Sequence, residues 1–185
     1  MKRIVLTFGL IAGGILSAVM AISLPLLMNG TIGFENGEVV GYSSMLLSFL
    51  AIFFGIRSYR EKNGGGSITF GKAFKVGILI TLIACSMYVI TWEIIYFNFA
   101  PDFADKYAAF TIDKMRADGA SSAEIVAAQK KMADFKEWYA NPLLNIGITF
   151  LEVFPIGLIV TLVSAAILRR KPAAGMNAPA AATVS

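Results

Sequence analysis

The chain has 185 residues, of which 57% are hydrophobic and 15% are charged, and its mean hydropathy is +0.70. This composition excludes an ordinary soluble domain, since soluble domains typically carry about 25% charged residues. The net charge of +4 does not indicate a nucleic-acid partner, because the meaning of a charge in a membrane protein depends on the side on which it lies. We therefore expect the lipid bilayer as the partner of this chain and no nucleic acid.

Four apolar segments run along the chain, at about residues 4–28, 43–58, 73–100 and 142–168. Roughly 20 helical residues cross a bilayer core about 30 Å thick, so the pattern predicts an all-α membrane protein. Its four transmembrane helices would form a single domain, residues 1–171. A cleaved signal peptide is the alternative for the first segment, although that apolar run is longer than the roughly 7–15 residues of a signal core.

Small residues recur at helical spacing along these segments and predict faces where a neighbouring helix approaches closely. We interpret them as the packing faces of one compact bundle, with a dedicated dimerisation motif as the alternative. The oligomeric state is not predicted. The most regular sets are Gly9, Gly13, Ser17 and Ala21, then Gly77, Thr81 and Cys85, then Gly157, Thr161 and Ala165.

Charged residues lie almost entirely between the apolar segments and are sorted by side. The two terminal segments and the loop between the second and third apolar segments together carry a charge of +9, whereas the two loops on the other side carry −3. Because cytoplasmic loops carry the excess of Lys and Arg, we expect both the N and the C terminus in the cytoplasm.

Residues 102–139 are predicted to form an extracytoplasmic helical hairpin between transmembrane helices 3 and 4, with helices at about 102–118 and 122–139. Ser121 and Glu124 match a capping box at the start of the second helix. Apolar stripes on both helices predict that they bury each other. The alternatives are a cap over the bundle and a docking surface for a membrane or periplasmic protein partner.

Two further segments carry weaker signals. In residues 29–42, Asn36-Gly37 is typical of a tight turn, and we expect a small β-hairpin there. Residues 172–185 are rich in Ala and Pro and carry no charge, which predicts a disordered tail.

Two carboxylates, Glu93 and Glu152, lie inside the apolar segments and are the best candidates for a functional site. Asn145, Thr149 and Glu152 share one helix face and form a polar stripe that ends at Glu152. One interpretation is a water-accessible pocket for a cation, a proton or a small polar ligand. The other is a pair of hydrogen-bonded carboxylates that stabilises helix packing.

The sequence contains no histidine and one cysteine, so the common zinc, haem and iron–sulfur ligand sets are missing. It also lacks a recognisable catalytic constellation. We therefore expect no catalytic residues, no metal and no cofactor, and a protein that is not an enzyme.

Six short motifs are spread over most of residues 1–171. They are Gly41-Tyr42, Phe53-Phe54-Gly55-Ile56, Phe70-Gly71-Lys72-Ala73, Trp92-Glu93, Pro101-Asp102-Phe103 and Phe154-Pro155-Ile156-Gly157. Together these motifs resemble the bacterial domain-of-unknown-function family 4199. The resemblance implies a multi-pass protein of the bacterial inner (cytoplasmic) membrane with about four helices, and it includes Glu93 and Glu152 in the family pattern. It implies no activity.

Two functional hypotheses follow from the sequence. The favoured one is a non-enzymatic scaffold or accessory protein, because the helical hairpin is the largest segment outside the apolar stretches. The alternative is a small transporter or ligand-binding membrane protein that uses Glu93 and Glu152.

Overall fold

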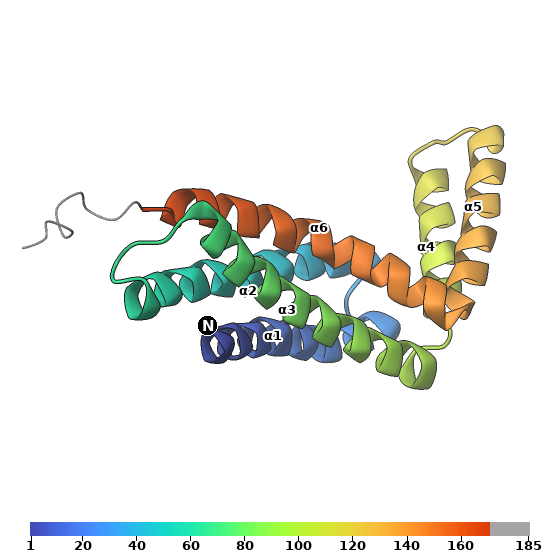
Figure 1. The fold of residues 1–185 in the computed structure, drawn as a ribbon. Helices are drawn as coiled ribbons and strands as arrows, with labels where there is room; N and C mark the ends of the chain where they lie inside the picture. The colour runs from blue at the N-terminus through green and yellow to red at the C-terminus, as the bar shows by residue number, and fades with distance from the viewer. Residues whose placement is uncertain (171–185) are drawn as a thin grey trace, which may run out of the picture.

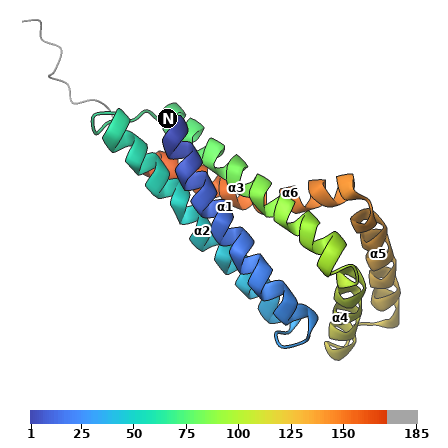
Figure 2. The ribbon, with the colours of Figure 1, turned by 90° about the horizontal axis from the view of Figure 1, so that it is seen from below.

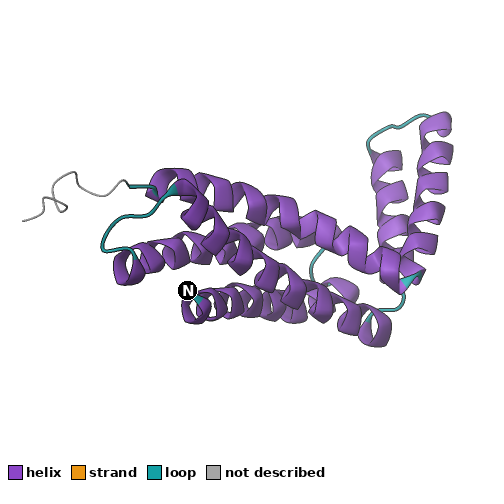
Figure 3. Cartoon of the chain, in the orientation of Figure 1, coloured by secondary structure: helices purple, strands orange, loops and turns teal. Residues whose placement is uncertain are grey.

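The computed structural model describes residues 1–170, so the expected tail at 172–185 lies outside the described residues. The described chain is helical apart from short loops and one isolated bridge between Ile68 and Arg170 (Figure 3). The helices are α1 (Lys2–Met28), α2 (Phe34–Asn63), α3 (Phe70–Phe99), α4 (Phe103–Ala117), α5 (Ser122–Ala140) and α6 (Pro142–Leu168).

Four of these helices, α1, α2, α3 and α6, are long and apolar enough to cross a membrane. Their outer faces carry large apolar side chains that are about two-thirds exposed, for example Ile22, Leu47, Leu151 and Ile167. A bundle that is apolar on its outside as well as in its core is suited to a lipid environment. The prediction of an all-α protein with four span-like helices is confirmed.

The four long helices form one elongated bundle (Figures 1 and 2). Within it, α2 and α3 each pack against the other three long helices. The pair α4–α5 stands at one end, which we call the hairpin end, and α5 also packs against α6. The N terminus and the last turn of α6 lie at the opposite end of the bundle (Figure 1).

Close packing between the long helices depends on the small residues that the sequence singled out. A Cβ added to Gly9 would lie 2.8 Å from the Cβ of Ile83 on α3, and one added to Gly157 would lie 2.5 Å from Thr81 Cγ2. The hydroxyls of Thr81 and Thr161 share a hydrogen bond of 2.9 Å between α3 and α6. The predicted small-residue faces thus serve as packing faces within a single bundle.

The expected β-hairpin at residues 29–42 is wrong, because α2 begins at Phe34 and continues through Asn36-Gly37. The ring of Phe34 packs against that of Phe103 on α4, with 6.0 Å between their centroids. At Gly37 an added Cβ would collide with Leu27, so the missing side chain lets α1 approach α2. Tertiary packing therefore outweighs the local turn signal.

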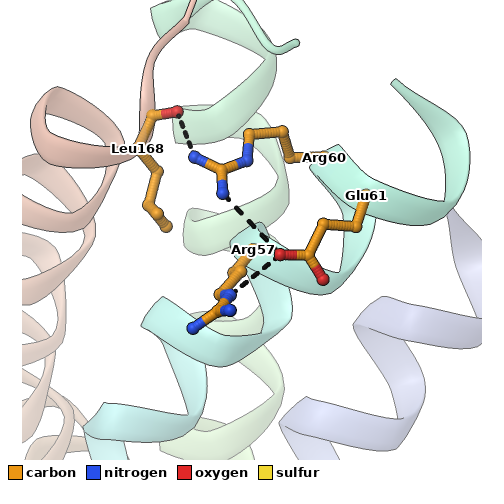
Figure 4. A network of polar contacts seen from close by, with 4 residues as sticks. All are labelled: Arg57, Arg60, Glu61 and Leu168. Carbon is orange, nitrogen blue, oxygen red and sulfur yellow. Dashed lines mark hydrogen bonds and ion pairs between the residues drawn. The ribbon is translucent and has the colours of Figure 1, made fainter. Parts of the chain in front are cut away.

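At the end opposite the hairpin, a polar network joins α2 to α6 (Figure 4). Arg57 donates to Glu61 through Nε at 2.9 Å, and Arg60 forms an ion pair with the same carboxylate at 3.7 Å. Arg60 also donates to the carbonyl oxygen of Leu168 at 3.4 Å. These contacts extend α2 beyond the expected segment 43–58 and satisfy a carbonyl at the end of α6.

The helices α4 and α5 begin and end within one residue of the expected bounds. Gly119, with φ of +80°, follows α4, and the predicted capping box of Ser121 and Glu124 is present at the start of α5. The carboxylate of Glu124 accepts from the Ser121 backbone N–H at 2.8 Å. These hydrogen bonds keep the pKa of Glu124 below its usual range.

Candidate functional site

A cavity of about 320 Å³ opens between the long helices at the hairpin end, and residues from all six helices line it. Its deepest residues are Leu16, Met45, Tyr88 and Glu152. Each lies 10–12 residues from the hairpin end of its helix, which corresponds to about 15–18 Å along the helix axis. The cavity therefore extends well into the bundle.

Aromatic side chains close the cavity on the side of α4 and α5. We call this group the aromatic roof, and its rings contact one another from helix to helix. Ring centroids lie 5.0 Å apart for Trp92 and Phe103, 5.7 Å for Tyr107 and Phe135, and 4.0 Å for Phe135 and Tyr139. The six members, all of which line the cavity, are Phe34, Trp92, Phe103, Tyr107, Phe135 and Tyr139.

Glu152 is the deepest charged residue of the cavity. Its side chain is exposed and forms part of the cavity lining. Thr149, one turn nearer the hairpin end, is buried and contributes to the same wall. The structure thus brings two of the predicted site residues, Thr149 and Glu152, into one cavity.

Asn145 has a different role from its neighbours on the polar stripe. It is fully buried and does not line the cavity. Its Oδ1 accepts from Trp92 Nε1 at 2.8 Å and from Thr149 Oγ1 at 3.2 Å, while its Nδ2 donates to the Tyr139 carbonyl at 3.1 Å. Asn145 therefore fixes two members of the aromatic roof to α6 and is a positioning residue.

The second carboxylate of the cavity is Glu38 of α2, near the roof. Tyr107 donates its hydroxyl to Glu38 Oε1 at 3.4 Å. Burial, together with the negative charge of Glu38, raises the pKa of Tyr107. Burial and the charge of Glu152 raise the pKa of Tyr139 in the same way. Both phenols therefore stay protonated at neutral pH and are available as hydrogen-bond donors.

Glu93, the other predicted carboxylate, lies outside the cavity. It is partly buried on α3 and does not line the cavity, although the preceding residue, Trp92, does. Its Oε1 is enclosed and has no hydrogen-bond partner among residues 1–170. The structure therefore does not bring Glu93 into the cavity that Glu152 lines.

Sequence reasoning missed Glu38 and the aromatic roof as parts of the site. In the sequence, Glu38 contributes only to the charge of the loop expected at residues 29–42. The available signal was the pair Gly37 and Gly41, whose spacing of four is typical of a helix with a small-residue face. On such a helix, Glu38 lies next to the packing face, and its side chain is expected at the edge of the bundle interior.

Residues 7–170 match the family described as "Protein of unknown function (DUF4199)". No curated protein and no solved structure matches the chain. Among the described residues, no group of three or more acidic or cysteine side chains is placed to hold a metal ion.

Proposed function

The chain belongs to a family of proteins of unknown function, and from the geometry of its cavity we propose that it is a membrane protein that binds a small molecule. The binding site is the cavity beneath the aromatic roof, and the protein acts without catalysis. The single observation that carries this proposal is a cavity of about 320 Å³ that contains an accessible carboxylate, Glu152.

The size and lining of the cavity support binding rather than mere imperfect packing. Ligand pockets are mostly apolar concavities of roughly 300–1,000 Å³ with a few convergent polar groups. Here the apolar wall surrounds Glu38, Glu152 and Thr149, together with several phenol hydroxyls. A packing defect of this size would be costly in a bundle whose other contacts are as close as those of Gly9 and Gly157.

The proposal includes an orientation in the membrane. We place the protein in the bacterial inner membrane with both termini in the cytoplasm and the hairpin in the periplasm. The charge of +9 on the side of the termini and −3 on the hairpin side supports this orientation. The cavity would then lie in the periplasmic half of the bundle.

The scaffold hypothesis keeps one specific support. Val126 and Trp138 are apolar side chains on α5 that are 64% and 52% exposed, and a partner protein could contact them. The apolar stripe on α5, for which docking was the alternative to packing within the hairpin, lies partly inside the protein, since Phe135 and Tyr139 line the cavity and Ala128 is buried. We therefore rank the scaffold role second.

A cavity-filling variant tests the binding function. Gly41 lines the cavity and an added Cβ would meet no atom within 4 Å, so Gly41→Leu would place its side chain in open space. Gly147 of α6 is equally open but lies outside the cavity, which makes Gly147→Leu the matched control.

The measurement is thermal unfolding in detergent micelles with choline, tetramethylammonium, benzoate, acetate and glucose as probes. A probe that binds at 100 times its Kd should raise the Tm of the native protein and of Gly147→Leu by about 5–10 °C. The same probe should leave the Tm of Gly41→Leu unchanged, because the leucine side chain occupies the binding space. The proposal fails if no probe raises the Tm, or if Gly41→Leu responds as strongly as the control.

A further inference from the structure

We propose that the ligand of this cavity is an organic cation, of the substituted ammonium class. This inference rests on the proposed binding function and specifies its ligand. It is based on three features of the cavity: the sign of its charge, the chemistry of its roof and the shape of its polar lining.

The charged residues that line the cavity are acidic. Among residues 1–170, no Lys or Arg belongs to the lining, and Glu38 and Glu152 are its only charged residues. Neither forms an ion pair with a Lys or Arg among residues 1–170. An uncompensated carboxylate at membrane depth is costly, and a cationic ligand would remove that cost.

Two lysines at the hairpin end have other partners. Lys106 forms an ion pair with Asp102 at 3.0 Å and donates to the carbonyl of Met28 at 3.0 Å. Lys114 lies 3.5 Å from a carboxylate oxygen of Glu35. These bonds direct the two ammonium groups toward acids that do not line the cavity, so its negative charge remains available to a ligand.

The roof is suited to an organic cation. Trp, Tyr and Phe faces attract a cation through the ring quadrupole, and several rings around one pocket form the usual cage for a quaternary or methylated ammonium. The six roof residues are joined by Tyr42 and Tyr88, which also line the cavity. Eight aromatic side chains thus surround a space that holds two carboxylates.

The same features disfavour a bare metal ion. Calcium requires about six to eight oxygen ligands at 2.3–2.6 Å, and magnesium demands a near-ideal octahedron. The cavity instead is largely apolar, and its two carboxylates lie at different depths, Glu38 near the roof and Glu152 at the floor. A ligand with an apolar body and a delocalised positive charge matches this lining better.

Charge-selective labelling of a cysteine in the cavity tests the inference. Ser23 and Ser44 line the cavity on α1 and α2, and the single native cysteine, Cys85, is fully buried, so the unmodified chain is the background control. We would compare Ser44→Cys and Ser23→Cys in their reaction with cationic MTSET and anionic MTSES. Ser122→Cys, exposed at the start of α5, gives the reference ratio of the two rates.

We expect MTSET to be favoured at Ser44→Cys and Ser23→Cys by at least about fivefold relative to Ser122→Cys, the factor that one unit charge at about 4 Å supplies even in bulk water. Adding Glu152→Gln should reduce this preference, and tetramethylammonium should slow MTSET at both cavity positions without slowing it at Ser122→Cys. If Glu152→Gln does not fold, Glu38→Gln should reduce the preference for MTSET instead, and the competition with tetramethylammonium tests the inference without either variant.

The outcomes separate this inference from the binding function. If both reagents enter with the reference ratio, the preference for cations is refuted, while the test with Gly41→Leu still stands for the binding function. If a lower pH slows MTSET labelling at the cavity positions but tetramethylammonium does not, a proton rather than an organic cation occupies Glu152, and the inference fails. If neither reagent reacts at either cavity position, the cavity is closed to small molecules and both proposals fail.

Discussion

The contact between α3 and α6 beneath the cavity should be intolerant of a single added methyl group. In Gly157→Ala the new Cβ would lie 2.5 Å from Thr81 Cγ2 and 3.1 Å from Phe49 Cζ, whereas ordinary contacts begin at 3.4 Å. The two helices must therefore separate by up to about 0.9 Å. Thr81 cannot move freely, because its hydroxyl is bonded to Thr161 at 2.9 Å and to the Gly77 carbonyl at 3.1 Å.

The expected loss of stability combines three contributions. Overpacking costs about 1–3 kcal/mol, and weakening one hydrogen bond between membrane helices costs about 0.6 kcal/mol. The higher helix propensity of Ala relative to Gly offsets up to about 1 kcal/mol of this loss. We therefore expect Gly157→Ala to lower the free energy of unfolding by about 1–2.5 kcal/mol, and the Tm by about 3–8 °C.

Gly147→Ala is the control, since it lies on the same helix and an added Cβ there meets no atom within 4 Å. It should be as stable as the native protein or slightly more stable. The assay is unfolding in mixed micelles, followed by the fluorescence of the two tryptophans, Trp92 and Trp138. Equal stability of Gly157→Ala and Gly147→Ala would show that α3 and α6 do not approach as closely as described.

Two further predictions concern the hub of the roof and the orientation of the chain. Asn145→Leu should leave the Trp92 indole N–H and the Tyr139 carbonyl without partners, lowering the free energy of unfolding by about 2 kcal/mol; unchanged stability and unchanged Trp fluorescence would contradict the assigned role. A phosphatase that is active only outside the cytoplasm should work when fused after Gly119 and be silent after Gly64, and the reverse pattern would overturn the orientation.

Much of the fold follows from short-range signals in the sequence. The capping box of Ser121 and Glu124 determines the start of α5 locally, without help from the rest of the chain. The spacing of Gly77, Thr81 and Gly157 identified the faces on which α3 and α6 meet, because only small residues permit so close an approach. Signals of this kind can be read directly from a sequence.

The candidate site was less predictable because it depends on which helices are neighbours. Glu93 and Glu152 give the same signal in sequence, an acid within an apolar run. Their difference arises from the rotation of α3 and α6 about their axes relative to the other helices, which leaves Glu152 facing the cavity and Glu93 outside it. The roof likewise combines residues from four helices, and Phe34 joined it only because α2 starts earlier than the turn signal predicts.

The packing below the cavity favours a binding protein over a transporter. The polar stripe on α6 ends at Glu152, and the next residue, Val153, is fully buried together with Phe49 and Ile80. At the depth of Ile80, the hydroxyls of Thr81 and Thr161 are bonded to each other rather than open to a path. A passage toward the other end of the bundle would have to separate α3 and α6 at the close contacts of Gly77 and Gly157. A ligand that enters the cavity would therefore reach Glu152 and dissociate through the same opening.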